Sequence, residues 1–230
     1  MKKKTKKTII FIVLFSVIGI IASKIPFTNI IGSNTAFSLF DFIGPISGMF
    51  LGMWGALSVL LVKLADFFIS GSALDTSTII RFFPMMAAAI YMASKSKQIA
   101  VIPLVAMILF WMHPEGRQVW YYALYWLIPI AAVFMKKRLI FNALGATFTA
   151  HAVGSVAFLY AFNLPAEVWT ALIPVVWMER GLMASGIWVS YTAFNTAIDK
   201  ILVNKFHWNY FKDLVNENYT LSRKFFKSFS

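Results

Sequence analysis

The sequence contains no cysteine, which excludes disulfides, thiolate catalysis and metal sites built on cysteine ligands. Charged residues are also scarce: Asp, Glu, Lys and Arg make up 13% of the 230 residues, whereas a soluble domain carries about a quarter. Hydrophobic residues reach 60%, too many for a globule of this size to cover with polar surface. The solvent of this chain is therefore largely lipid.

Motifs of catalysis and nucleotide hydrolysis are absent as well. The chain has no Walker A sequence, no His-Glu-x-x-His and no Gly-x-Ser-x-Gly. Its three histidines, His113, His151 and His207, are widely separated, so we expect neither a metal site nor another cofactor. The protein is therefore expected not to be an enzyme, and an ATP-driven function would need a separate protein.

Apolar runs long enough to cross a bilayer, about 17 to 20 residues, recur along the chain. They predict an all-α membrane bundle of about eight transmembrane helices, or six to seven if the short second and fifth runs do not cross. The predicted helices are Thr8–Ser23, Phe37–Met53, Gly55–Ser70, Ser77–Ala93, Gln98–Met112, Gln118–Met135, Leu139–Phe162 and Val168–Leu202. We assign residues 1–203 to a single transmembrane domain, with 139–203 as its C-terminal helix pair. Residues 204–230 are expected to form a basic, aromatic cytoplasmic tail at the membrane interface.

The net charge of +12 comes from short basic clusters between the apolar runs. With an even number of crossings, most lysines and arginines fall on one side, as the positive-inside rule requires of cytoplasmic loops. We therefore expect both termini in the cytoplasm and a multi-pass protein of the plasma membrane. An anionic lipid leaflet explains these clusters, so we expect a lipid bilayer and no nucleic acid as partner.

Small residues predict close helix packing at two places. Gly44, Gly48 and Gly52 are spaced i, i+4 and i+8, which leaves one edge of the second predicted helix as bare backbone. Ser16, Gly19 and Ser23 share a face of the first predicted helix. That second face could pack internally or dock the helix of a partner protein.

Ionisable residues within predicted spans are costly in lipid and are functional by default. Asp66 and Arg81 both lie about 6 Å below the outer surface on consecutive helices, so we expect them to pair. His151 and Glu179 match in depth near the midplane and are expected to meet, whereas Arg180 should point elsewhere. The functional interpretation is a polar cavity that opens outward and holds a ligand; the alternative is an ion-pair network that only fixes helix register.

Three aromatic residues, Tyr125, Trp126 and Trp177, lie deeper than an interfacial belt requires and could stack on a flat ligand. They complete the predicted substrate-binding set, which is Asp66, Arg81, Tyr125, Trp126, His151, Trp177, Glu179 and Arg180. The long outer loop Lys24–Ala36 could fold over this site as a lid or serve as an ordinary connector.

One stretch resembles a known family. The residues are Phe40-Asp41-Phe42-Ile43-Gly44-Pro45-Ile46-Ser47-Gly48, then Gly52-Met53-Trp54-Gly55-Ala56 and Leu64-Ala65-Asp66. Together with the basic N-terminus and the first helix, they resemble the substrate-binding (S) components of energy-coupling factor vitamin transporters over roughly the first hundred residues. That family has six helices rather than eight, and its alanine docking motif is only approximated by Gly19-x-x-x-Ser23.

The resemblance implies a membrane-embedded substrate-capture subunit that works with a transmembrane coupling protein and ATPase subunits. Nickel and cobalt members of that family depend on a histidine near the N-terminus, which this chain lacks, so a small organic micronutrient is the expected solute. Three alternatives stay open: a proton-coupled secondary transporter with His151 and Glu179 as a relay, an intramembrane enzyme with His151 as base, and a membrane scaffold.

Overall fold

The computed structural model describes residues 2–29, 36–71 and 73–221, which form a helical bundle with one small hairpin. The α-helices are α1 (Lys2–Ser23), α2 (Phe40–Ile43), α3 (Ile46–Leu51), α4 (Met53–Ser70), α5 (Thr76–Ile80), α6 (Phe82–Ala93), α7 (Val101–Met112), α8 (Pro114–Gln118), α9 (Leu127–Ala132), α10 (Leu139–Phe162) and α11 (Ala166–Ala197). Shorter 3₁₀ segments are η1 (Lys97–Ala100), η2 (Trp120–Trp126), η4 (Asn209–Leu214) and η5 (Glu217–Tyr219), and the π-helical η3 (Ile198–Lys205) extends α11. Among the described residues, five helices are long and apolar enough to cross a membrane.

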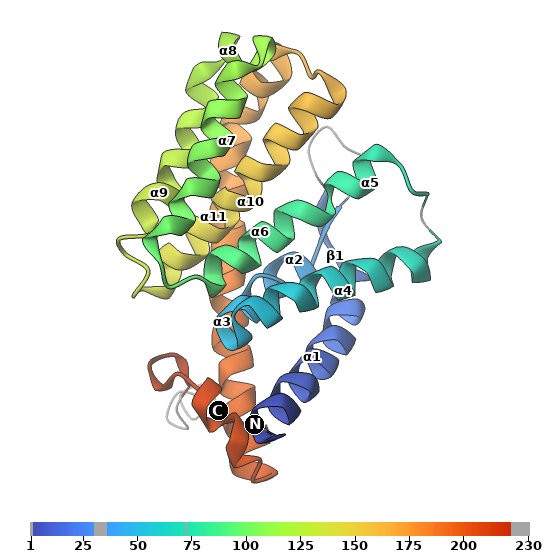
Figure 1. Cartoon of the computed structure of the whole chain (residues 1–230), viewed down its shortest axis with the longest axis vertical. Helices are drawn as coiled ribbons and strands as arrows, with labels where there is room; N and C mark the ends of the chain where they lie inside the picture. The colour runs from blue at the N-terminus through green and yellow to red at the C-terminus, as the bar shows by residue number, and fades with distance from the viewer. Residues whose placement is uncertain (1, 30–35, 72, 222–230) are drawn as a thin grey trace.

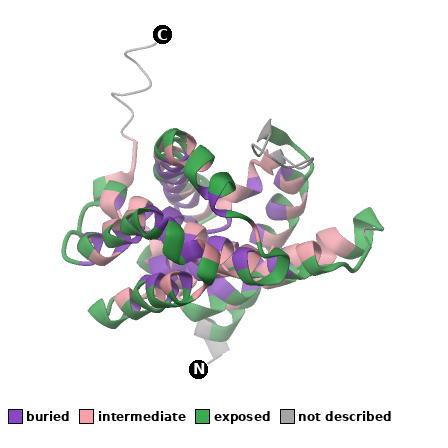
Figure 2. Ribbon diagram, turned by 90° about the horizontal axis from the view of Figure 1, so that it is seen from above, coloured by how far each residue is buried: buried purple, intermediate pink, exposed green. Residues whose placement is uncertain are grey.

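Helix α11 is the long axis around which the other elements are arranged (Figure 1). Helices α7 to α10 gather along its upper part, and α10 packs against α6, α7, α9 and α11. Helices α4 and α6 cross the middle of the molecule, while α1 descends to the end where both chain termini lie. Buried residues concentrate at the centre of the view in Figure 2, with exposed residues at the periphery. The all-α membrane bundle predicted from the apolar runs is confirmed at this level.

Helix boundaries match the sequence prediction where the apolar run is uninterrupted. Helix α10 has the predicted bounds, Leu139–Phe162, but the second and sixth predicted helices are broken. Pro45 separates α2 from α3, because proline has no N–H to continue the helical ladder. Pro129 likewise cannot donate to the carbonyl of Tyr125, and the chain before α9 is the 3₁₀ segment η2.

The long outer loop contains an antiparallel hairpin that the sequence analysis did not predict. Strand β1 (Pro26–Asn29) pairs with β2 (Ala36–Ser38), and residues 30–35 of the candidate lid lie outside the described residues. The ring of Phe27 packs edge-on against Phe42, with 4.8 Å between centroids. The hairpin is thereby attached to α2, next to the centre of the bundle.

Close packing of α3 against α6 confirms the role predicted for Gly48, whereas Gly52 has no neighbour within 4 Å of a Cβ. A Cβ at Gly48 would lie 2.0 Å from the carbonyl oxygen of Ala89, so only hydrogen fits there. The neighbouring Ser47 hydroxyl lies 2.7 Å from the carbonyl oxygen of Gly44 and 2.8 Å from that of Gly55, so its single proton is shared between these two acceptors. Gly52, with φ of 61°, makes the turn into α4.

We predict that Gly48→Ala lowers the free energy of unfolding in detergent by about 1–3 kcal/mol, because the methyl group forces α3 and α6 apart. Gly181→Ala is the matched control, since nothing lies within 4 Å of a Cβ at Gly181. Thermal unfolding of the two variants checks this, and equal midpoints would contradict the close contact.

Helix α1 turns its small residues inward, which corrects the expected docking face. A Cβ at Gly19 would lie 2.9 Å from the ring of Phe40, and the Ser23 hydroxyl donates to Asp66 at 2.7 Å. Ser16 is only partly exposed. The Ser16, Gly19 and Ser23 face therefore packs largely within the bundle. Beyond the basic start of α1, its exposed side chains are apolar: Ile9, Val13, Leu14, Val17, Ile18 and Ile21.

The described part of the tail folds back onto the bundle, contrary to the expectation of a segment lying only on lipid. Phe211 is fully buried, and the Asn195 side chain holds the tail by donating to the Asn216 carbonyl at 2.8 Å and accepting from its N–H at 2.8 Å. The Tyr219 hydroxyl accepts from the N–H of Leu139 at 2.9 Å. The tail thus connects the lower end of α11 to the start of α10. Residues 222–230 lie outside the described residues.

Lys136, in the turn between α9 and α10, is a half-buried cation that reaches the end of α6. Its ammonium donates to the carbonyls of Tyr91 at 2.8 Å and Ser94 at 3.0 Å, and it lies 3.9 Å from the centroid of the Tyr91 ring. These groups favour the ammonium form, yet burial prevails and lowers the pKa of Lys136 to about 8.

This shift predicts how stability depends on pH. The ordinary pKa of 10.5 applies to the unfolded chain, so between about pH 8 and 10.5 the unfolded state binds more protons. The burial cost is fully present below pH 8 and is relieved as pH rises toward 10.5. We therefore expect the unfolding midpoint of the wild type to rise over this range relative to Lys136→Met. A constant difference between the two proteins across the range would show that Lys136 keeps its ordinary pKa.

Candidate functional site

Arg180 of α11 is a buried cation whose hydrogen bonds are incomplete. Its side chain is 9% exposed, and Nη2 donates to the Glu179 carboxylate at 3.2 Å. Nη1 lies 3.5 Å from the Thr147 hydroxyl of α10, which makes a long, weak bond. Its Nε has no partner; among the described residues, Asn142 Oδ1 is the other buried side-chain atom in this state. One donor of the guanidinium is therefore buried without a hydrogen bond.

The N-terminal half of the chain completes the surroundings of Arg180. The guanidinium lies over the ring of Phe37, on β2, at 5.3 Å from the centroid. Asp41 of α2 is close enough to attract it electrostatically, and its own carboxylate accepts from the N–H of Ser38 at 2.7 Å. Elements far apart in sequence, β2, α2, α10 and α11, therefore meet at one cation. Such convergence is what a binding site between helices requires.

His151 of α10 is held as a neutral imidazole. The indole N–H of Trp126 can only donate, and it lies 3.1 Å from Nδ1, so that nitrogen is an acceptor. The proton is then on Nε2, which lies 2.9 Å from the Tyr122 hydroxyl. Both nitrogens are thus occupied by aromatic partners from η2. His151 contributes a fixed, uncharged wall near Arg180 rather than the predicted contact with Glu179.

The predicted stacking residues fall into two environments. Trp126 is fully buried behind His151, so it supports the site rather than facing a ligand. Tyr125 and Trp177 contact each other edge-on at 5.3 Å, and both lie against Phe148. Trp177 is 59% exposed. The half-buried Tyr125 and the exposed Trp177 therefore form an aromatic pair that is connected to His151 through Phe148.

Asp66 has a partner other than the predicted Arg81. Its carboxylate accepts from Lys24 at 2.7 Å and from Ser23 at 2.7 Å, both at the end of α1. Arg81 lies at the junction of α5 and α6, where it attracts Asp75. The N–H of Thr78, which Asp75 caps, holds the pKa of the Asp75 carboxyl below its usual value. Asp66 thus fastens α1 to α4 and is not among the groups around Arg180.

The structure therefore brings together six of the eight predicted residues: Tyr125, Trp126, His151, Trp177, Glu179 and Arg180. The expectation that Arg180 points away from this group is wrong. Arg180 pairs with Glu179 and lies close enough to His151 to interact with it electrostatically. Four contributors were missed: Phe37, Asp41, Thr147 and Tyr122. Thr147 precedes His151 by four residues and Asp41 lies within the glycine-proline stretch, so spacing could have suggested both.

The described residues contain no group of three His, Cys, Asp or Glu side chains that could hold a metal ion. No family model matches the chain, and no solved structure matches it. A protein of Methanocaldococcus jannaschii, the uncharacterized protein MJ0923, is 26% identical over 204 residues. The similarity covers 79% of this chain and 68% of the archaeal protein. Because that protein is uncharacterized, the function has to be argued from the geometry of the site.

The Glu179–Arg180 pair makes a stability prediction. Glu179→Gln leaves a buried guanidinium without its counter-charge, so we expect the free energy of unfolding to fall by about 3 kcal/mol. Adding Arg180→Met removes the uncompensated charge and should restore most of that loss. Unfolding of the single and double variants in detergent checks this. A double variant less stable than the single would mean that Arg180 stabilises the fold without Glu179.

Proposed function

We propose that this protein is the membrane-embedded substrate-capture subunit of an uptake transporter and that its solute is a small organic molecule with an anionic group. The observation that carries the proposal is Arg180, a buried guanidinium with an unpartnered Nε. A cation in a membrane bundle costs several kcal/mol and is retained where it serves a ligand or a pathway. A planar guanidinium also matches a carboxylate or phosphate in geometry.

The groups around Arg180 favour an anion of modest size over a metal ion. Glu179 neutralises part of the charge, Asp41 lies farther off, and the Phe37 ring covers the guanidinium with a cation–π contact. A ring held in this way can be displaced by a stronger anionic partner. The solute would then take the place of Phe37 beside Arg180 and lie against Tyr125 and Trp177.

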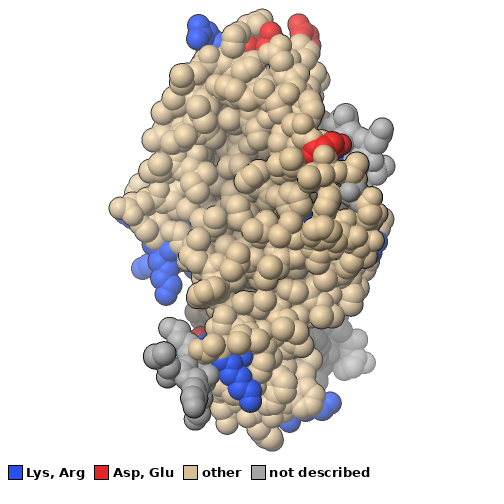
Figure 3. Space-filling view, turned by 45° about the vertical axis from the view of Figure 1, so that its right-hand side comes forward, with Lys and Arg blue, Asp and Glu red and all other residues tan. Residues whose placement is uncertain are grey.

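The topology we propose is eight crossings with both termini in the cytoplasm of a plasma-membrane protein. The basic clusters support this topology, and the start of α1 and the described part of the tail lie toward the same end of the molecule (Figure 1). In the face drawn in Figure 3, most Lys and Arg side chains lie in the lower half, and broad uncharged surface separates them from the charges at the upper end. Energy would come from a coupling protein and ATPase subunits, as in energy-coupling factor systems. Leu14, Ile18 and Ile21, which are exposed on α1, offer a contact for that coupling protein.

A proton relay through His151 and Glu179 has less support. Both nitrogens of His151 are bonded to Trp126 and Tyr122, and Glu179 is paired with Arg180. A relay needs a nitrogen that is free to exchange its proton. Substrate capture therefore remains the function that the geometry supports best.

The test is native mass spectrometry of the full chain purified in mild detergent. We expect a co-purified organic anion in the wild type, its loss in Arg180→Met, and its retention in Arg117→Met, which removes a surface arginine at the outer turn. Unfolding midpoints of both variants show whether they are folded. If the anion is retained equally in folded Arg180→Met, or if the wild type is reproducibly empty, the proposal fails.

A further inference from the structure

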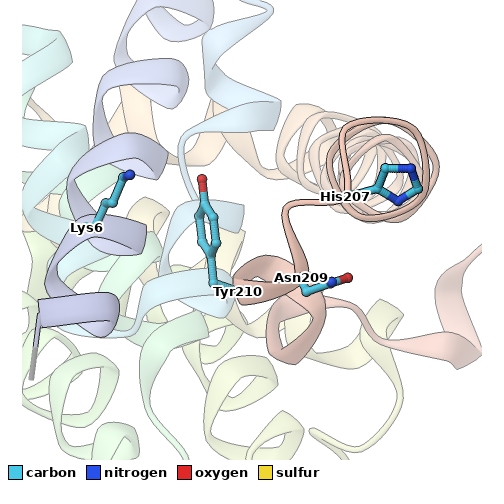
Figure 4. Close-up of a pocket in the computed structure, with 4 residues that line it drawn as sticks. All are labelled: Lys6, His207, Asn209 and Tyr210. Carbon is cyan, nitrogen blue, oxygen red and sulfur yellow. The ribbon is translucent and has the colours of Figure 1, made fainter.

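A pocket lies at the lower end of the molecule, where the start of α1 meets the tail. Its volume is about 480 Å³, and it is lined by Lys6, His207, Asn209 and Tyr210 (Figure 4). His207 has φ of 55°, which turns the chain back after η3, and η4 then packs against α1. In Figure 4 the ammonium of Lys6 and the hydroxyl of Tyr210 point to the same side of the pocket.

The pocket carries positive charge that the described residues do not neutralise. Lys7 is buried and pairs with Asp213, so the nearest carboxylate is already engaged. Lys6 is exposed and has no ion-pair or hydrogen-bond partner among the described residues, and the lining contains no acidic side chain. The Lys6 ammonium and the Tyr210 hydroxyl, which point to the same side, supply donors for a phosphate group, whereas the Asn209 side chain points away from them (Figure 4).

An apolar ridge leads away from Lys6 along α1. Ile9, Val13 and Val17 follow Lys6 at i+3, i+7 and i+11, so all four share one helix face. Their exposed fractions are 56%, 55% and 53%. From Lys6 to Val17 the ridge rises about 16 Å, close to half the thickness of a bilayer core of about 30 Å. A cation at the end of an exposed apolar ridge of this length matches a lipid, with its headgroup at Lys6 and its acyl chains along α1.

We infer that this pocket binds the phosphate headgroup of an anionic phospholipid. Lys6 provides the charge, Tyr210 provides a neutral hydrogen bond, and Ile9, Val13 and Val17 contact the chains. A soluble phosphate compound could satisfy the polar groups but would leave the ridge unused. The bound lipid would fasten α1 to the tail at the end of the bundle, independently of the site at Arg180.

The experiment is native mass spectrometry of the full chain with added phosphatidylglycerol or phosphatidylcholine. We expect adducts of phosphatidylglycerol in preference to phosphatidylcholine, a several-fold loss in Lys6→Gln and a smaller loss in Tyr210→Phe. The matched control is Lys95→Gln, which removes an exposed lysine in the turn after α6 and should retain the lipid. Inorganic phosphate and glycerol phosphate are added in excess in a second arm and should not displace it.

Three results would overturn the inference. Equal loss in Lys6→Gln and Lys95→Gln would mean that the lipid responds to overall charge and not to the pocket. Equal adducts of both lipids would show that the pocket does not select a headgroup with net negative charge. Displacement by inorganic phosphate would assign the pocket to a soluble ligand. Unfolding midpoints close to the wild type in both lysine variants confirm that folded proteins are compared.

Discussion

A guanidinium buried in a membrane bundle has to be neutralised and oriented by its neighbours, and in this protein that requirement joins segments from both halves of the chain. Arg180 and Glu179 come from α11, Thr147 from α10, and Phe37 from β2. Water cannot solvate the charge at this depth, so these elements have to stay together. The remaining packing can be understood as what places them around the cation.

The stretch of residues 40–56, rich in glycine and with Pro45, contributes most to that packing. Lipid provides no hydrophobic drive for helix association, so backbone contact has to replace it. Gly48 lets α3 lie directly on the carbonyl of Ala89 in α6, and Ser47 satisfies the carbonyls exposed by the turn. With α3 fixed in this way, Pro45 ends the preceding helix, so that α2 is short and Asp41 lies on the side of Arg180.

Sequence periodicity predicted the helices better than the contacts between them. Hydropathy located α10 to the residue, because an uninterrupted apolar run has no competing signal. Depth comparisons failed for both predicted ion pairs, since a rise of about 1.5 Å per residue gives height but not rotation about the helix axis. Asp66 pairs with Lys24, which directly follows α1, and Glu179 pairs with Arg180, the residue next to it. Such choices depend on side-chain direction, which spacing alone does not specify. The hairpin was missed because its strands have only four and three residues.

Helix α11 connects the two ends of the molecule in a way that a shorter helix could not. Arg180 and Asn195 lie on the same helix, fifteen residues or about 22 Å apart. Asn195 is fully buried and holds the tail through both the NH₂ and the carbonyl oxygen of its side-chain amide. The tail in turn contacts α1 through Lys7 and Asp213 and reaches the start of α10 through Tyr219. The length of α11 beyond a single span is therefore used: it carries Arg180 in one part and holds the described part of the tail, and through it the start of α1, in the other.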